Sequence, residues 1–91
     1  MARLNLQALP MTSLQLFSTS GCHLCELAKQ QLDALAIQNS LVYEEIEIAL
    51  SEELVELYGV RIPVLREAVS GREIGWPFDL ALLEGFLASL S

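Results

Sequence analysis

The spacing of the hydrophobic residues changes several times between residues 13 and 90, and each change predicts a new strand or helix. Residues 13–17 alternate as in a short strand, and residues 18–21 supply a turn. A helix is then predicted to begin at the two cysteines, because apolar residues recur along one stripe and polar residues occupy the other face. The apolar stripe consists of Leu24, Leu27, Ala28, Leu32, Leu35 and Ala36, and the polar face of Glu26, Lys29, Gln30 and Asp33.

The middle of the chain predicts a second strand followed by a second helix. Residues 41–48 contain β-branched residues with partial alternation, which favours a strand. Ser51 supplies a capping hydroxyl for a helix, and the two acidic residues that follow it are typical of a first helical turn. Gly59 is the predicted end of this helix.

The last third of the chain predicts a hairpin and a final helix. Residues 60–65 indicate the entry to a third strand, residues 70–71 a hairpin turn, and residues 72–74 a short fourth strand. Asp79 is expected to cap the last helix. The resulting order is βαβαββα. The last helix has apolar residues at i, i+3, i+4 and i+7, namely Leu83, Phe86, Leu87 and Leu90.

Residues 1–12 contain Pro10 and Met11 and show no clean periodicity. We therefore expect a poorly ordered extension there, ahead of a single domain at residues 13–91. A chain of 91 residues, 53% of them hydrophobic, is long enough for one compact core and too short for two.

The net charge of the chain makes some classes of binding partner unfavourable. Five lysines and arginines face twelve aspartates and glutamates, which gives a net charge of -7. This balance argues against nucleic acids and anionic membrane surfaces as partners. The chain has no apolar run of about 20 residues, as a membrane span needs, and its first residues lack the apolar stretch of a secretory signal, so we expect a cytoplasmic protein. We expect Glu44, Glu45 and Glu47 to form solvated surface.

The candidate chemistry lies at Cys22 and Cys25, the only cysteines in the sequence. In a reducing compartment such a pair is more often catalytic or metal-binding than a structural staple. Cys22 lies at a helix start, where unpaired backbone N–H groups favour the thiolate, so we predict Cys22 as the nucleophile and Cys25 as the resolving thiol. The alternative is half of a zinc site, but structural zinc takes four protein ligands and His23 is the only other Cys or His.

Three segments carry a resemblance to a known family: residues 22–25 (CHLC), residues 58–65 (YGVRIPVL) and residues 71–79 (GREIGWPFD). In these segments the chain resembles a family of small bacterial glutaredoxin-like proteins whose physiological role is undefined. The resemblance implies an α/β, thioredoxin-like fold of the glutaredoxin type, βαβαββα, with a central four-stranded mixed sheet flanked by helices. It also implies a cis peptide between Ile62 and Pro63, with Pro63 facing the cysteine pair.

The resemblance suggests supporting roles for the neighbours of the cysteines. Ile62 and Pro63 would form the wall of a groove that aligns the substrate. Arg61 either favours a thiolate or holds a substrate carboxylate, and otherwise is a solvated surface arginine. His23 either raises the thiolate fraction of Cys22 or is an exposed helix-start residue without a catalytic part.

Residues 74–80 resemble the segment with which glutaredoxins bind glutathione. Gly75 and Asp79 match its first glycine and its aspartate, whereas Trp76 stands in place of the second glycine. The indole would obstruct the backbone of glutathione, and residues 17–21 offer no cation for a glutathione carboxylate, so both features argue against glutathione as a ligand. Asp79 is either a ligand or only a helix cap, and Trp76 either lines the substrate groove or belongs to the core.

The predicted activity is dithiol–disulfide exchange in cell redox homeostasis, with no bound cofactor or metal required. The expected partners are a disulfide-bearing protein or low-molecular-weight thiol and an unidentified reductase, and the protein is expected to be a monomer. A second hypothesis is a non-catalytic thioredoxin-fold carrier or adaptor that binds an iron–sulfur cluster or a partner protein.

Overall fold

The structure of the protein, a computed structural model, describes residues 13–39 and 41–90, and for residues 38 and 39 it gives the backbone only. The extension expected at residues 1–12 lies outside the described residues. The elements are β1 (Leu14–Ser18), α2 (His23–Asn39), β2 (Tyr43–Glu47), the 3-10 helix η1 (Ile48–Leu50), α3 (Glu52–Tyr58), β3 (Val64–Glu67), β4 (Glu73–Gly75) and α4 (Leu80–Ala88).

The four strands form one mixed sheet in the order β2-β1-β3-β4. β1 pairs with β2 in parallel, and β3 pairs antiparallel with both β1 and β4. The parallel pair is joined through helix α2, as a parallel connection requires. In the register, Phe17 lies opposite Ile46 on one side and Val64 on the other. β1 is therefore an inner strand, and its C-terminal end leads directly to the cysteines.

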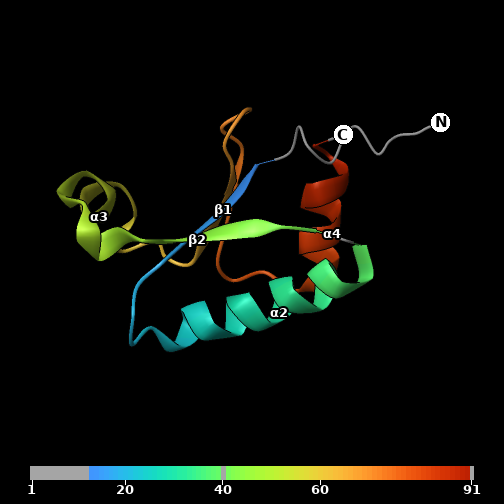
Figure 1. Cartoon of the computed structure of the whole chain (residues 1–91), viewed down its shortest axis with the longest axis horizontal. Coiled ribbons are helices and arrows are strands. Elements are labelled where there is room, and N and C mark those ends of the chain that lie inside the picture. The colour runs from blue at the N-terminus through green and yellow to red at the C-terminus, as the bar shows by residue number, and fades with distance from the viewer. Residues whose placement is uncertain (1–12, 40, 91) are drawn as a thin grey trace.

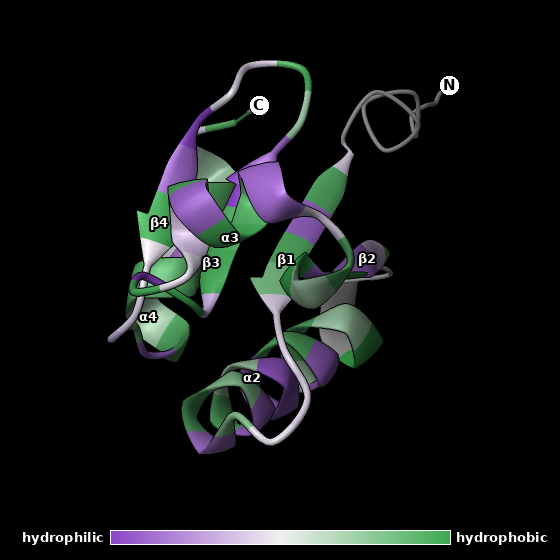
Figure 2. Cartoon of the chain, turned by 90° about the vertical axis from the view of Figure 1, so that its left-hand side faces the viewer, coloured by the Kyte–Doolittle hydropathy of each residue, from purple (hydrophilic) through white to green (hydrophobic). Residues whose placement is uncertain are grey.

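Helices cover both faces of this sheet. Helices α2 and α4 lie on one face and α3 on the other (Figure 2), and in Figure 1 α2 runs along the lower part of the molecule with α4 at the right and α3 at the left. Because successive strand residues point to opposite faces, the alternation in β1 divides the core in two. The α2 side contains Leu14, Leu16, Ala28, Leu32, Leu35, Leu65, Phe78 and Leu83, and the α3 side contains Phe17, Ile48, Tyr58 and Val64.

The predicted helix ends are confirmed. Ser51 caps α3 by accepting the Leu54 N–H on its hydroxyl at 3.3 Å, and Gly59 is the C-cap. Asp79 caps α4 by accepting the Leu82 N–H at 2.9 Å.

The position of Leu24 in the apolar stripe of α2 was predicted wrongly, because its side chain is 44% exposed. The buried line of α2 runs instead through Cys25, Ala28, Leu32 and Leu35. Leu24 lies at the edge of this line, about 100° around the helix from Cys25, and in the first turn of α2 it remains exposed. The sulfur of Cys25 thus takes the core position that we expected for a leucine.

The third strand begins later than the sequence predicts. The N–H groups of Arg61 and Ile62 both donate to the Tyr58 carbonyl, so the chain makes a turn beyond α3. Pro63 has no N–H to offer a strand partner. β3 consequently starts at Val64 rather than near residue 60.

Candidate redox site

Cys22 and Cys25 form a disulfide between the end of β1 and the first turn of α2. Their Cα atoms are 5.2 Å apart. Cys22 precedes the first residue of α2, and its sulfur accepts the Cys25 N–H at 3.1 Å. The Cys22 carbonyl accepts the Glu26 N–H at 3.2 Å, as the residue that caps a helix does. The sulfur of Cys22 is therefore positioned where a backbone N–H and the helix terminus both stabilise a negative charge.

The two cysteines differ in exposure. Cys25 is buried, with 4% of its surface exposed, whereas Cys22 is partly exposed. An incoming reactant therefore reaches Cys22 first, and Cys25 is protected behind it. His23 is exposed at the first residue of α2.

A pocket of about 390 Å³ opens beside the disulfide. It lies between the loop that follows β1, the first two turns of α2 and the edge strand β2. The residues that line it are Ser18, Thr19, Ser20, Gly21, Cys22, Cys25, Glu26, Lys29, Glu45 and Glu47.

Glu47 fixes the loop that precedes Cys22. Its carboxylate accepts the Ser20 N–H and the Ala49 N–H, each at 3.0 Å. Hydrogen bonds from the Thr19 hydroxyl first, and then from these N–H groups, hold the pKa of Glu47 below its usual value. The turn from β1 to the cysteines is thus held against β2.

Glu45 makes a second link on the same strand face. One oxygen accepts the Ser18 hydroxyl at 2.9 Å, and the other lies 3.3 Å from the Lys29 ammonium. We expected Glu45 and Glu47 to be plain solvated surface. The signal that brings them to the cysteines is the parallel register, in which Ser18 lies opposite Glu47.

Ile62 and Pro63 lie near the same end of β1. The Ile62–Pro63 peptide is cis, and Pro63 is buried. Because Val64 lies opposite Phe17, Pro63 comes next to the point where the chain leaves β1 for the cysteines. Its carbonyl accepts the Trp76 N–H at 3.1 Å, and Ile62 packs on the apolar cluster beneath α3.

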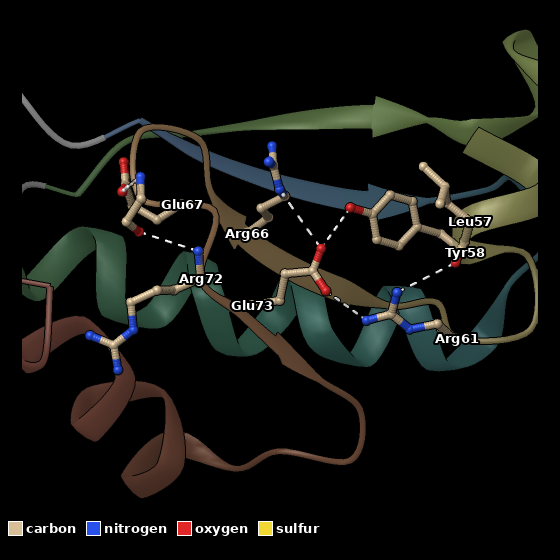
Figure 3. Close-up of polar contacts among 8 residues, drawn as sticks. Leu57, Tyr58, Arg61, Arg66, Glu67, Arg72 and Glu73 are labelled. Carbon is tan, nitrogen blue, oxygen red and sulfur yellow. Dashed lines mark hydrogen bonds and ion pairs between the residues drawn. The ribbon is translucent and has the colours of Figure 1, made fainter. Parts of the chain in front are cut away.

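Arg61 is held in a polar cluster around Glu73, shown in Figure 3. The Glu73 carboxylate accepts Arg61 Nη2 at 2.6 Å and the Tyr58 hydroxyl at 2.7 Å, and Arg66 Nε lies 3.7 Å away. Burial raises the pKa of Glu73, but the hydrogen bonds from Tyr58 and Arg61 and the nearby positive charges outweigh it, so this pKa is lowered overall. The Tyr58 ring stacks on Phe17, with 4.2 Å between ring centroids.

The Arg61 guanidinium is thus engaged by Glu73 and the Tyr58 ring, 5.1 Å from the ring centroid. In the part of the chain that the structure describes, Arg61 is not one of the residues that line the pocket beside the disulfide. A role for Arg61 toward a substrate carboxylate stays a prediction.

The segment from Gly75 to Asp79 lies on the other side of α2. Gly75 ends β4 opposite Val64, and the Trp76–Pro77 peptide is cis. Trp76 is half-buried, meets Phe78 edge to face at 5.1 Å, and packs against the α2-side core. It also lines a second, mostly apolar groove of about 480 Å³ with Leu27, Gln30, Gln31, Ala34, Phe78 and Leu80. Trp76 therefore packs against the core, and its place in a substrate groove stays a prediction.

Two further observations concern the described residues only. Within residues 13–39 and 41–90, no three His, Cys, Asp or Glu side chains are grouped so that they could hold a metal ion. In the same part of the chain, no helix has the length and apolar character needed to cross a membrane.

Comparison with known proteins agrees with this geometry. The family described as Glutaredoxin-like domain (DUF836) matches residues 13–88. The chain belongs to this family. The fold and the close cysteine pair of this glutaredoxin-like domain together suggest a redox function.

Solved structures of similar proteins share the thioredoxin-like fold, which confirms the predicted fold class. The X-ray structure of protein XcR50 from X. campestris is 37% identical, with 84% of this chain and 96% of that chain covered and a TM-score of 0.73. Protein Ne2328 from Nitrosomonas europaea is 29% identical, with coverages of 82% and 89% and a TM-score of 0.70. The germline-specific thioredoxin Deadhead from Drosophila melanogaster is 25% identical, with coverages of 88% and 81% and a TM-score of 0.63. No curated protein matches the chain.

Proposed function

We propose that this glutaredoxin-like domain is a thiol–disulfide oxidoreductase that exchanges its Cys22–Cys25 dithiol with substrate disulfides. The observation that carries the proposal is the asymmetric setting of the two sulfurs. Cys22 is partly exposed at the helix start and its sulfur accepts the Cys25 N–H at 3.1 Å, whereas Cys25 is buried one turn further along. This setting supports one attacking and one resolving thiol.

The proposed exchange has two steps. The Cys22 thiolate attacks one sulfur of the substrate disulfide, that S–S bond breaks, and the released half leaves as a thiol after taking up a proton. The Cys25 thiol, once deprotonated, then attacks the Cys22 sulfur and releases the second half. Two electrons pass from the protein dithiol to the substrate, and the Cys22–Cys25 disulfide forms.

The neighbouring residues have proposed roles in alignment. Ile62 and Pro63 lie at the same end of β1 as the cysteines and would form the wall on which the substrate chain rests. His23, next to Cys22, would raise the thiolate fraction when it is protonated. Gly75 and Trp76 lie on the other side of α2, where they would complete a substrate groove, whereas Asp79 would act only as the cap of α4.

The proposed cellular setting is the reducing cytoplasm of a bacterium, where the domain would transfer electrons as a monomer between a reductase and a disulfide-bearing protein or low-molecular-weight thiol. The exchange needs no bound cofactor or metal. Glutathione is a weaker candidate than other thiols, because residues 17–21 contain no cation and Arg61 is engaged by Glu73.

Trapping of the mixed disulfide tests this function. Reduced Cys25→Ser, treated with a disulfide-linked model peptide, should accumulate a Cys22–peptide adduct detectable by mass spectrometry, because the resolving thiol is missing. Cys22→Ser should form no adduct, since Cys25 is buried. Equal adduct yields in the two variants would contradict the assigned roles.

The same preparations distinguish the carrier hypothesis from the oxidoreductase hypothesis. A brown protein with a cluster absorbance that disappears in Cys22→Ser would favour an iron–sulfur carrier. A colourless protein whose dithiol is oxidised by the peptide and reduced again would favour the oxidoreductase.

A further inference from the structure

We propose that the pocket between α2 and β2 receives the group attached to the attacked substrate sulfur and selects a positively charged group. The inference rests on the proposed exchange at Cys22 and adds the substrate class. The preferred substrates would be disulfides that carry an ammonium or guanidinium group a few bonds from sulfur.

The pocket adjoins the reacting atoms themselves. Both cysteines belong to its lining, so any substituent on a sulfur that docks at Cys22 has this space of about 390 Å³ beside it. The hydroxyl-bearing residues Ser18, Thr19 and Ser20 also line it, so the wall offers hydrogen-bonding atoms as well as apolar ones. A small charged group can therefore find polar partners there.

Charge in the pocket is predominantly negative. Three carboxylates, those of Glu26, Glu45 and Glu47, face a single ammonium, that of Lys29. The Lys29 ammonium is already paired with Glu45 at 3.3 Å, so it is engaged before a substrate arrives. The carboxylates thus exceed the cations by two, within a chain whose net charge is -7.

The carboxylates are held in place by the fold. Glu47 accepts two main-chain N–H groups at 3.0 Å, and Glu45 accepts the Ser18 hydroxyl at 2.9 Å. Within residues 13–39 and 41–90, Glu26 makes no hydrogen bond or ion pair that would engage its carboxylate. Glu26 is therefore free to pair with a substrate cation, and Glu47 supplies a fixed negative charge nearby, since Lys29 offsets the charge of Glu45.

A matched series of small disulfides measures this selectivity. Cystamine is cationic, bis(2-hydroxyethyl) disulfide is neutral and 3,3′-dithiodipropionate is anionic, and the three are similar in size. The pre-reduced protein is mixed with each, and oxidation of its dithiol is followed by alkylation and mass. Each rate is divided by the rate for dithiothreitol with the same disulfide, which removes the intrinsic reactivity of the reagent.

We expect the normalised rate to be on the order of tenfold higher for cystamine than for dithiodipropionate at low salt, with the neutral reagent between them, because two unscreened charges at a few ångströms act on each reagent. The ratio should shrink toward one at about 1 M salt, where the screening length is about 3 Å. Equal normalised rates for all three would overturn the pocket inference and leave the exchange reaction standing. If none of the three oxidises the dithiol, the proposed function itself fails.

Variants that remove a negative or a positive charge from the pocket test whether the pocket is the source of the selectivity. Glu26→Gln should lower the cystamine-to-dithiodipropionate ratio roughly two- to threefold, and Lys29→Gln should raise it, because the two changes alter the pocket charge in opposite directions. Glu84→Gln, on α4 and outside the pocket lining, changes the net charge equally and should leave the ratio unchanged. An equal fall in Glu26→Gln and Glu84→Gln would assign the selectivity to overall charge and overturn the pocket as its source.

A peptide arm distinguishes small aminothiols from cysteine-containing chains. Two disulfide-linked peptides that differ only in a lysine or a glutamate next to cysteine are compared in the same way. A lysine preference that falls in Glu26→Gln would extend the selection to peptides, whereas a preference for the glutamate peptide would contradict it.

Discussion

Replacing Tyr58 with phenylalanine removes one hydroxyl and keeps the ring. The hydroxyl donates to Glu73 Oε2 at 2.7 Å, whereas the ring stacks on Phe17 and faces the Arg61 guanidinium. Tyr58 is only 6% exposed, and phenylalanine fills the same space apart from the hydroxyl. Tyr58→Phe therefore isolates the polar link between α3 and β4, which supports the turn leading to Pro63.

The loss in free energy of unfolding can be estimated from the partners that Glu73 keeps in the variant. A hydrogen bond to a charged group contributes about 1.5–3 kcal/mol and a neutral one about 0.5–1.5 kcal/mol. Glu73 keeps Arg61 and Arg66 in the variant, so its carboxylate is not left unpaired. We therefore expect the free energy of unfolding to fall by about 1 kcal/mol, which for a domain of this size lowers Tm by about 5 °C.

The effect of Tyr58→Phe should depend on pH. Burial opposes ionisation of Glu73, but the hydrogen bonds and positive charges lower its pKa from the ordinary value of 4.5. A carboxyl with a lowered pKa in the folded state stabilises the protein above its unfolded pKa, and this contribution is lost as the pH falls through the folded pKa. The Tm difference between the native chain and Tyr58→Phe should be full at pH 7 and narrow below about pH 4.5.

Thermal unfolding followed by circular dichroism, with both proteins in the disulfide form, measures this difference. The matched control is Tyr43→Phe, because the Tyr43 hydroxyl donates to Asp33 at the same distance of 2.7 Å but at an exposed site. Water replaces that bond, so the control should lose less stability. If Tyr58→Phe lowers Tm no more than Tyr43→Phe does, the cluster around Glu73 does not stabilise the fold as described.

Three further predictions concern the stability of the fold that surrounds the site. Glu67→Gln should lower Tm at pH 7, and the difference should fade between pH 4.5 and about pH 2 in a pH series of unfolding curves, because hydrogen bonds from Ser70 and other N–H groups lower the pKa of Glu67 to about 2. Asp79→Ala should cost about 1 kcal/mol through loss of the helix cap, whereas Asp79→Ser should restore most of it and leave disulfide exchange unchanged; slower exchange in Asp79→Ser would instead identify Asp79 as a ligand. Leu65→Ala should cost about 2–5 kcal/mol in urea titrations, because Leu65 is 0% exposed in the core, and a smaller loss would contradict its place there.

Much of the fold is predictable because its signals are local. The hydroxyl of Ser51 and the carboxylate of Asp79 each satisfy an N–H three residues ahead, so the helix starts can be located from a few neighbouring residues. The alternation in residues 13–17 and the hairpin turn at residues 70–71 are local in the same sense.

The surroundings of the cysteines depend on long-range pairing and were therefore less predictable. Glu45 and Glu47 reach the pocket only because β2 lies parallel to β1, a pairing of residues almost thirty positions apart. Arg61 is engaged by Glu73, which follows it by twelve positions across a turn and a strand. In both cases the nearby sequence gives only a charged residue, and the sheet register decides what that charge contacts.

The most direct test of the proposed exchange is an equilibrium redox titration of Cys22 and Cys25 in glutathione buffers of graded ratio, with the thiols alkylated and counted by mass. The account predicts one reversible two-electron transition between the dithiol and the disulfide, with the same midpoint reached from either starting form. A pair that cannot be oxidised under mild conditions, or that reaches different end points from the two directions, would contradict the assignment of this domain as a thiol–disulfide oxidoreductase.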